Sequence, residues 1–170
     1  AAAVAQETPR PAEFFYTHRG QVGKEAIRLQ DELFLPVSSI TNLGWGCTVS
    51  GEEAVVSAEG NTFRIKVRVL KNKMYLPMRA SIAKLGGGTS WREKGDALDA
   101  WGVVRAVTAR DGFISIESTL SASPNLLFVD NPSRVAIDLK GVRLSSDARL
   151  DLASISPAGQ LYLETLRVGV

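Results

Sequence analysis

Apolar and polar residues alternate along much of the chain from residue 13 onward. The alternation is clearest over residues 63–69, whose alternate positions hold Phe63, Ile65, Val67 and Val69. Shorter stretches with the same spacing occur at residues 27–29 and 33–35. Alternation with a period of two is typical of a strand that buries one face. The pattern therefore predicts a mainly β protein.

Two short segments interrupt the alternation and predict helices, at residues 37–43 and 78–85. Each segment follows a proline, Pro36 or Pro77, and each ends at a glycine. Proline suits the first turn of a helix, and glycine suits its end. Each predicted helix is about two turns long.

These helices belong to an internal repeat, formed by residues 33–49 and 74–91. Both copies contain an apolar strand that ends in Leu-Pro, a short amphipathic helix, a Leu-Gly stop and a further strand. One such unit is too small to bury its own apolar face. The two copies are therefore expected to pack into one α+β domain, with a sheet against a pair of short helices.

After Trp101 the sequence pattern changes and predicts a second set of strands. A turn signal at residues 110–112 precedes a predicted strand, and a hairpin is predicted over residues 126–144, with Val135, Ile137 and Leu139 on one face. We therefore predict an extended leader over residues 1–12, a first domain over 13–105 and a second over 106–170. The small-residue start of the chain resembles the flank left by signal-peptide removal, which predicts an extracytoplasmic location.

Composition excludes several functional classes. The 170 residues contain 20 Lys and Arg against 18 Asp and Glu, a net charge of +2, which is too even to predict a nucleic-acid partner. Cys47 and His18 are the only thiol and imidazole, so a self-contained zinc site is not expected. No apolar run is long enough for a membrane span. We predict no cofactor and no metal.

The second copy of the repeat resembles the copper amine oxidase N-terminal, or stalk, domain. The resemblance rests on Leu76, Pro77, Arg79, Leu85, Gly86, Gly87 and Trp91. The first copy departs from that pattern, since Ser38 stands where the family usually has arginine. In that family the copper and the quinone lie in a separate catalytic domain. The resemblance therefore implies an accessory module of a secreted or cell-wall bacterial protein.

The predicted hairpin resembles the signature of AMIN domains, which are β-sandwich modules of the bacterial envelope. The residues that carry the resemblance are Phe128, Asn131, Pro132, Arg134, Val135, Asp138 and Leu139. The family's usual ligand is peptidoglycan, and its members target periplasmic amidases and secretins. AMIN sequences usually continue into a further strand, so the resemblance implies a sandwich that is incomplete within these residues.

No catalytic motif is found, and no catalytic residue is predicted. The chain has no G-x-S-x-G, no phosphate loop and no H-E-x-x-H. The carboxylate pairs Glu52 with Glu53 and Asp96 with Asp99 are interpreted as solvated turn charges. A small hydrolase that uses paired carboxylates is retained only as a third hypothesis.

Six residues are candidates for ligand binding. Three are the basic residues of the alternating strand, Arg64, Lys66 and Arg68, which form either a solvated face or a patch for anionic wall polymer. The others are Arg134, Asp138 and Tyr162. For Asp138 an ion pair with Arg134 or Arg143 is favoured over a ligand contact, and Tyr162 is interpreted as a strand residue with its hydroxyl at the rim.

The tryptophans offer two interpretations. Trp45, Trp91 and Trp101 could stack against sugars. Trp45 and Trp91, however, occupy similar places in the repeat, which favours core packing. Cys47 is interpreted as a small buried apolar side chain.

Together these features predict a non-catalytic targeting region of a larger envelope protein, with peptidoglycan or another cell-wall polymer as the partner. An N-acetylmuramoyl-L-alanine amidase, with its zinc domain outside this chain, fits that description. The alternative is an interaction module that binds envelope proteins of a secretin or pilus assembly through an open sheet edge.

Overall fold

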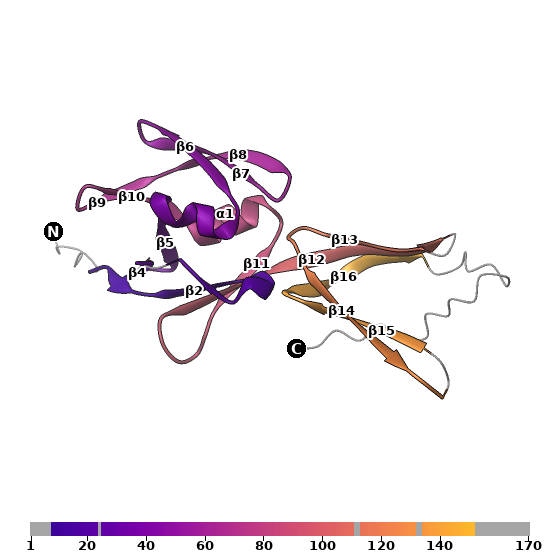
Figure 1. Ribbon diagram of the computed structural model, residues 1–170. Coiled ribbons are helices and arrows are strands. Elements are labelled where there is room, and N and C mark those ends of the chain that lie inside the picture. Colours follow the sequence, from indigo (N-terminus) through magenta and orange to yellow (C-terminus); the bar gives the residue numbers. More distant parts are fainter. Residues whose placement is uncertain (1–7, 24, 111–112, 132–133, 152–170) are drawn as a thin grey trace.

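The computed structural model describes residues 8–23, 25–110, 113–131 and 134–151, and it is mainly β (Figure 1). The predicted fold class is therefore confirmed. The first part of the chain contains β1 (Arg10–Pro11), β2 (Glu13–Tyr16), η1 (Thr17–Arg19), β3 (Gln21–Val22), β4 (Ile27–Leu29), β5 (Glu32–Pro36), η2 (Val37–Leu43), β6 (Gly46–Ser50), β7 (Glu53–Ala58) and β8 (Asn61–Lys66). It continues with β9 (Arg68–Leu70), β10 (Lys73–Pro77), α1 (Met78–Lys84), β11 (Gly88–Trp91), β12 (Ala97–Arg110), β13 (Phe113–Ser118), β14 (Ser123–Val129), β15 (Arg134–Lys140) and β16 (Val142–Asp151).

The described strands form four sheets. One has the order β1-β4-β5-β10-β9, and a second has the order β6-β7-β8. The third has the order β11-β12-β2-β3, with β13 and β16 also pairing with β12. The fourth is the two-stranded hairpin β14-β15.

The two copies of the repeat have the same order of elements. The first is β5-η2-β6 and the second is β10-α1-β11. Their leading strands are antiparallel neighbours, with Leu35 opposite Leu76. Both predicted helices are present, although the first is a 3-10 helix and the second is an α-helix. At the end of α1, Gly86 has φ +77° and its N–H donates to the carbonyl of Ala83, the glycine stop that the sequence predicts.

The core lies between these sheets and the two helices. Its fully buried side chains include Phe14, Tyr16, Leu33, Leu35, Ile40, Leu43, Leu76, Met78, Ile82 and Leu98. Trp45 is 3% exposed and belongs to the same cluster. The prediction that Trp45 packs in the core is thus confirmed.

The sequence pattern predicts one strand over residues 63–69, but the structure divides this segment between two strands, β8 and β9. The chain leaves β8 at Lys66 and enters a different sheet as β9, where Arg68 lies opposite Tyr75. Val67 between them donates its N–H to the carbonyl of Glu52. Val69, predicted to be buried, is 56% exposed, and β9 is an edge strand paired only with β10 among the described strands. Alternation alone did not reveal this change of sheet.

One long strand joins the two parts of the molecule. β12 pairs with β11 and β2 through its first residues, and with β13 and β16 further along (Figure 1). It therefore runs through residue 105, where we place the boundary between the two predicted domains. Its pairings with β2 and β16 are parallel and with β11 and β13 antiparallel.

Candidate functional site

The predicted hairpin is present and carries the AMIN-like residues. β14 and β15 pair with Leu126 opposite Ile137 and Phe128 opposite Val135. Directly opposed residues of a hairpin share a face, and successive residues alternate between faces. One face of the hairpin is consequently apolar and consists of Pro124, Leu126, Phe128, Val135, Ile137 and Leu139. We call it the apolar face.

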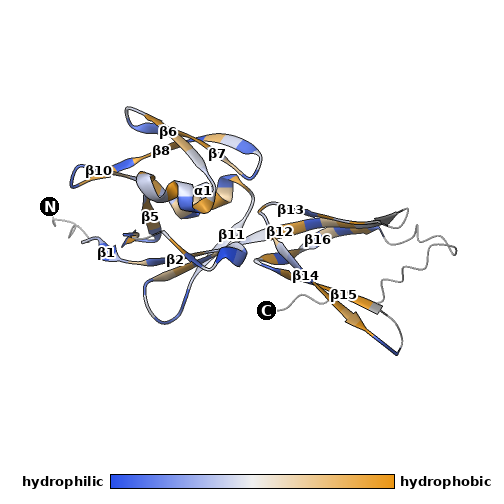
Figure 2. Cartoon of the chain, in the orientation of Figure 1, coloured by the Kyte–Doolittle hydropathy of each residue, from blue (hydrophilic) through white to orange (hydrophobic). Residues whose placement is uncertain are grey.

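The hairpin is rich in hydrophobic residues (Figure 2), and several side chains of its apolar face are exposed to solvent. Phe128 is 79% exposed, Leu126 is 53% exposed and Val135 is 45% exposed. Among the described strands, β14 pairs only with β15, so each has a free edge. Exposed apolar surface and unpaired edges are features of binding surfaces in β proteins.

The opposite face of the hairpin ends in a polar strip formed by Ser123, Asn125, Asp138 and Lys140. Asn125 lies opposite Asp138, and Ser123 lies opposite Lys140. The carboxylate of Asp138 is exposed and has no hydrogen bond or ion pair within the described residues. Arg143, one of the two expected partners, does not form an ion pair with Asp138, and its guanidinium lies 3.5 Å from the centre of the Trp101 ring.

Two of the predicted ligand-binding side chains lie outside the described part of the structure. Tyr162 lies outside the described residues, as does the side chain of Arg134, whose backbone begins β15.

The three basic candidates of the alternating segment do not form one unpaired patch. Arg64 forms an ion pair with Glu53 at 3.8 Å. Arg68 lies on β9, with its guanidinium 5.7 Å from the centre of the Phe34 ring. Lys66 is exposed at the end of β8. Since ion pairing and ring contacts engage Arg64 and Arg68, the solvated-face interpretation accounts better for these residues.

Three of the four carboxylates that were candidates for a hydrolase, Glu53, Asp96 and Asp99, form ion pairs. Asp96 forms ion pairs with Arg28 at 3.1 Å and Arg10 at 3.3 Å. Asp99 binds Arg92 at 2.8 Å. The charge of Asp96, whose side chain is only 29% exposed, is therefore balanced by ion pairs rather than by solvent alone.

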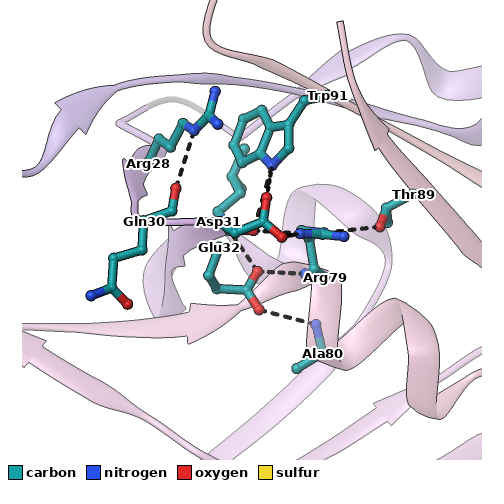
Figure 3. A network of polar contacts seen from close by, with 9 residues as sticks. Arg28, Gln30, Asp31, Glu32, Arg79, Ala80, Thr89 and Trp91 are labelled. Atoms are coloured by element: carbon teal, nitrogen blue, oxygen red, sulfur yellow. Dashed lines mark hydrogen bonds and ion pairs between the residues drawn. The ribbon is translucent and has the colours of Figure 1, made fainter.

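A polar network ties the two repeat copies together (Figure 3). Glu32 begins β5, and its Oε1 accepts hydrogen bonds from the backbone N–H groups of Arg79 at 2.7 Å and Leu33 at 2.9 Å. Its Oε2 accepts from the N–H of Ala80 at 3.2 Å. The carboxylate of the first copy therefore caps the helix of the second. Burial raises the pKa of Glu32, and these hydrogen bonds act in the opposite direction.

Arg79, the arginine of the L-P-x-R pattern, belongs to the same network. It forms an ion pair with Asp31 and also donates to the carbonyl oxygen of Asp31 at 2.7 Å (Figure 3). The indole N–H of Trp91 donates to Oδ1 of Asp31 at 3.1 Å, and the guanidinium of Arg28 lies 4.0 Å from the Trp91 ring centre. Trp91 is thus half-buried and packs against the edge of the core cluster, and its indole N–H donates to the turn that precedes β5.

A second network lies where the first part meets the second. The hydroxyl of Tyr16 donates to Glu59 and accepts from the indole N–H of Trp45 at 3.2 Å. Glu59 also accepts a hydrogen bond from the backbone N–H of Ser121 at 2.9 Å. Burial raises the pKa of the Tyr16 phenol above its ordinary value, and its hydrogen bond to Glu59 acts in the same direction.

Beside this network is an open polar pocket of about 560 Å³. Its walls come from the β7–β8 turn, from the end of α1 with the loop that follows, and from β12 and β13. The charged residues that line it are Glu59, Lys84, Arg105 and Glu117. Sequence reasoning missed this pocket. Lys84 adjoins the Leu-Gly stop, but no local pattern indicates that it lies near residues 105 and 117.

No protein-family model, no curated protein and no solved structure matches this chain. The two family resemblances therefore rest on the residues that carry them in the sequence. None of the helices in the described residues is long and apolar enough to cross a membrane.

Proposed function

We propose that this chain is a non-catalytic targeting region of a larger bacterial envelope protein, located outside the cytoplasm, and that it binds peptidoglycan. The observation that carries the proposal is the polar strip of the β14-β15 hairpin. Asp138 of the AMIN-like signature lies there, exposed and opposite Asn125. In this proposal, chemistry on the wall is performed by another segment, for instance an N-acetylmuramoyl-L-alanine amidase domain.

The strip has the chemistry that a cell-wall polymer requires. Peptidoglycan offers hydroxyl groups, amide N–H and C=O groups, and carboxylates. Asp138 accepts hydrogen bonds, Lys140 donates them, and the Asn125 amide does both. An exposed strip that contains both hydrogen-bond donors and acceptors can bind a polar polymer without burying an unpaired charge, which would cost free energy.

The test is co-sedimentation with purified sacculi at physiological salt. The chain should be retained, and the double substitution Asp138→Ala with Asn125→Ala should reduce retention at least several-fold. Glu93→Ala removes an exposed carboxylate away from the hairpin and serves as the matched control. Retention of the unsubstituted chain no greater than that of an unrelated protein would refute the proposal.

A second candidate function is supported by the apolar face and by the free edges of the same hairpin. Here the partner is an extended strand of another envelope protein, which pairs with an edge and covers Phe128 and its neighbours. Capture of such a protein, abolished by Phe128→Ser but unaffected by Asp138→Ala, would favour this function over glycan binding.

A further inference from the structure

The pocket of about 560 Å³ lies within the size range of small-ligand sites. Three segments far apart in the sequence form it, namely the β7–β8 turn, the end of α1 and the β12–β13 pair. It is distinct from the polar strip, which belongs to the hairpin. Both parts of the molecule contribute to its walls.

The charged side chains of this pocket differ in whether they already bind other groups of the protein. Glu59 is engaged, since it accepts hydrogen bonds from Tyr16 and Ser121. Lys84, Arg105 and Glu117 are exposed, and none of them has a hydrogen bond or an ion pair within the described part of the chain, although the charge of Arg105 also acts on the carboxylate of Asp147. The pocket therefore offers two cations and one carboxylate to a ligand.

The backbone positions Arg105 for this role. The register between β12 and β13 shifts between Val104 and Ala106, so Arg105 is the additional residue of a bulge. Bulges redirect side chains and often lie beside functional sites. At Gly86 an added Cβ would lie 2.7 Å from Nη2 of Arg105, so the guanidinium rests directly against a glycine of the α1 stop.

The lining residues suit a charged peptide better than a sugar. They include no aromatic ring among the described residues, whereas sugar sites usually contain one. A guanidinium binds a carboxylate through two parallel hydrogen bonds, and a lysine adds a second positive charge. Glu117 can accept hydrogen bonds from an ammonium group. A ligand with both charges would match all three groups.

We propose that this pocket binds the zwitterionic end of a short peptide, in which one residue carries a free carboxylate and a free ammonium group. Arg105 and Lys84 bind the carboxylate, and Glu117 binds the ammonium. This inference rests on the proposed function, because the diamino acid of a peptidoglycan stem peptide has such an end. The pocket would then bind the stem peptide, while the polar strip contacts the rest of the peptidoglycan.

The test is a titration of the full chain, followed by the backbone amide signals of the pocket in two-dimensional NMR. The probes are a stem tripeptide that ends in meso-diaminopimelate, its form with the side-chain carboxylate amidated, and its form with the side-chain amine acetylated. Saturable shifts are expected with the first probe. Each modification should weaken binding at least tenfold.

Substitutions assign the contacts. Arg105→Gln should weaken the unmodified peptide at least tenfold. Glu117→Gln should weaken the unmodified peptide but leave the acetylated one unchanged, because that probe has no ammonium group to lose. Arg64→Gln removes a cation outside the pocket and should change nothing. Thermal unfolding of each variant shows that the chain remains folded.

Two outcomes would overturn the inference. One is the absence of saturable shifts up to about 10 mM peptide, and the other is equal binding of all three probes. If sacculi retain the chain while the peptide fails to bind, the pocket inference is wrong and the proposed function stands. If the peptide binds in the pocket but sacculi do not retain the chain, the pocket inference stands and its peptide comes from another source.

Discussion

The carboxylate of Glu32 is expected to be a main stabilising contact between the two repeat copies. Glu32→Ala removes the acceptor of three backbone N–H groups, those of Leu33, Arg79 and Ala80. Loss of a helix cap costs about 1 kcal/mol, and a buried donor left without a partner costs about 1–3 kcal/mol. Since water can replace part of this contact, we expect a loss of about 2–4 kcal/mol in the free energy of unfolding.

Urea unfolding followed by circular dichroism and tryptophan fluorescence measures this loss directly. The melting temperature should fall by about 2–4 °C for each kcal/mol, given the size of the chain. Glu32→Gln should give a smaller loss, because its remaining oxygen still accepts from one or two of the N–H groups.

Glu25→Ala is the matched control, since Glu25 is an exposed glutamate whose ion pair within the described residues is with Lys73. It should leave the free energy of unfolding nearly unchanged. If Glu32→Ala were no more destabilising than Glu25→Ala, the claim that the first copy caps the helix of the second would be refuted.

Three further predictions concern the hairpin, a buried phenol and a close packing contact. Phe128→Ser should leave stability within about 0.5 kcal/mol while reducing binding of an apolar dye, because the ring is 79% exposed; a large loss of stability would contradict its exposure. The folded chain holds the Tyr16 proton to higher pH than the unfolded chain, so stability should fall as the pH rises above about 10. Tyr16→Phe should flatten that decline in urea titrations, and an unchanged slope would contradict it. Gly88→Ala should cost about 1–3 kcal/mol and shift tryptophan emission, since its Cβ would lie 2.5 Å from the Trp101 ring; unchanged emission would show that the ring is not against Gly88.

Sequence patterns predicted the helices and the hairpin, whose formation depends on residues close together in the chain. The Pro and Gly signals identified both helices, and the pattern of residues 126–144 identified the β14-β15 hairpin. These signals work because a helix end or a tight turn depends on the backbone preferences of a few adjacent residues. The repeat was equally visible, since the two copies have the same element order.

Contacts between distant segments could not be predicted in this way. Nothing near Glu32 indicates that it caps α1, and nothing near Arg105 indicates a bulge facing Gly86. The alternation at residues 63–69 predicts one strand because it records which side chains face inward, but not which sheet receives them. Of the candidate site, the place of Asp138 on the hairpin and the shared face of Val135, Ile137 and Leu139 came from the sequence.

β12 has a mechanical consequence for the molecule. A stalk and a head joined by a flexible linker would sample many relative orientations, whereas here one strand carries backbone hydrogen bonds to partners on both sides of the junction. Beyond the junction β12 is held on both edges, by β13 and by β16, so bending it there would disturb two ladders. If the hairpin binds the wall as proposed above, a pull on it would be carried toward the N-terminal sheets through β12 rather than through a flexible linker.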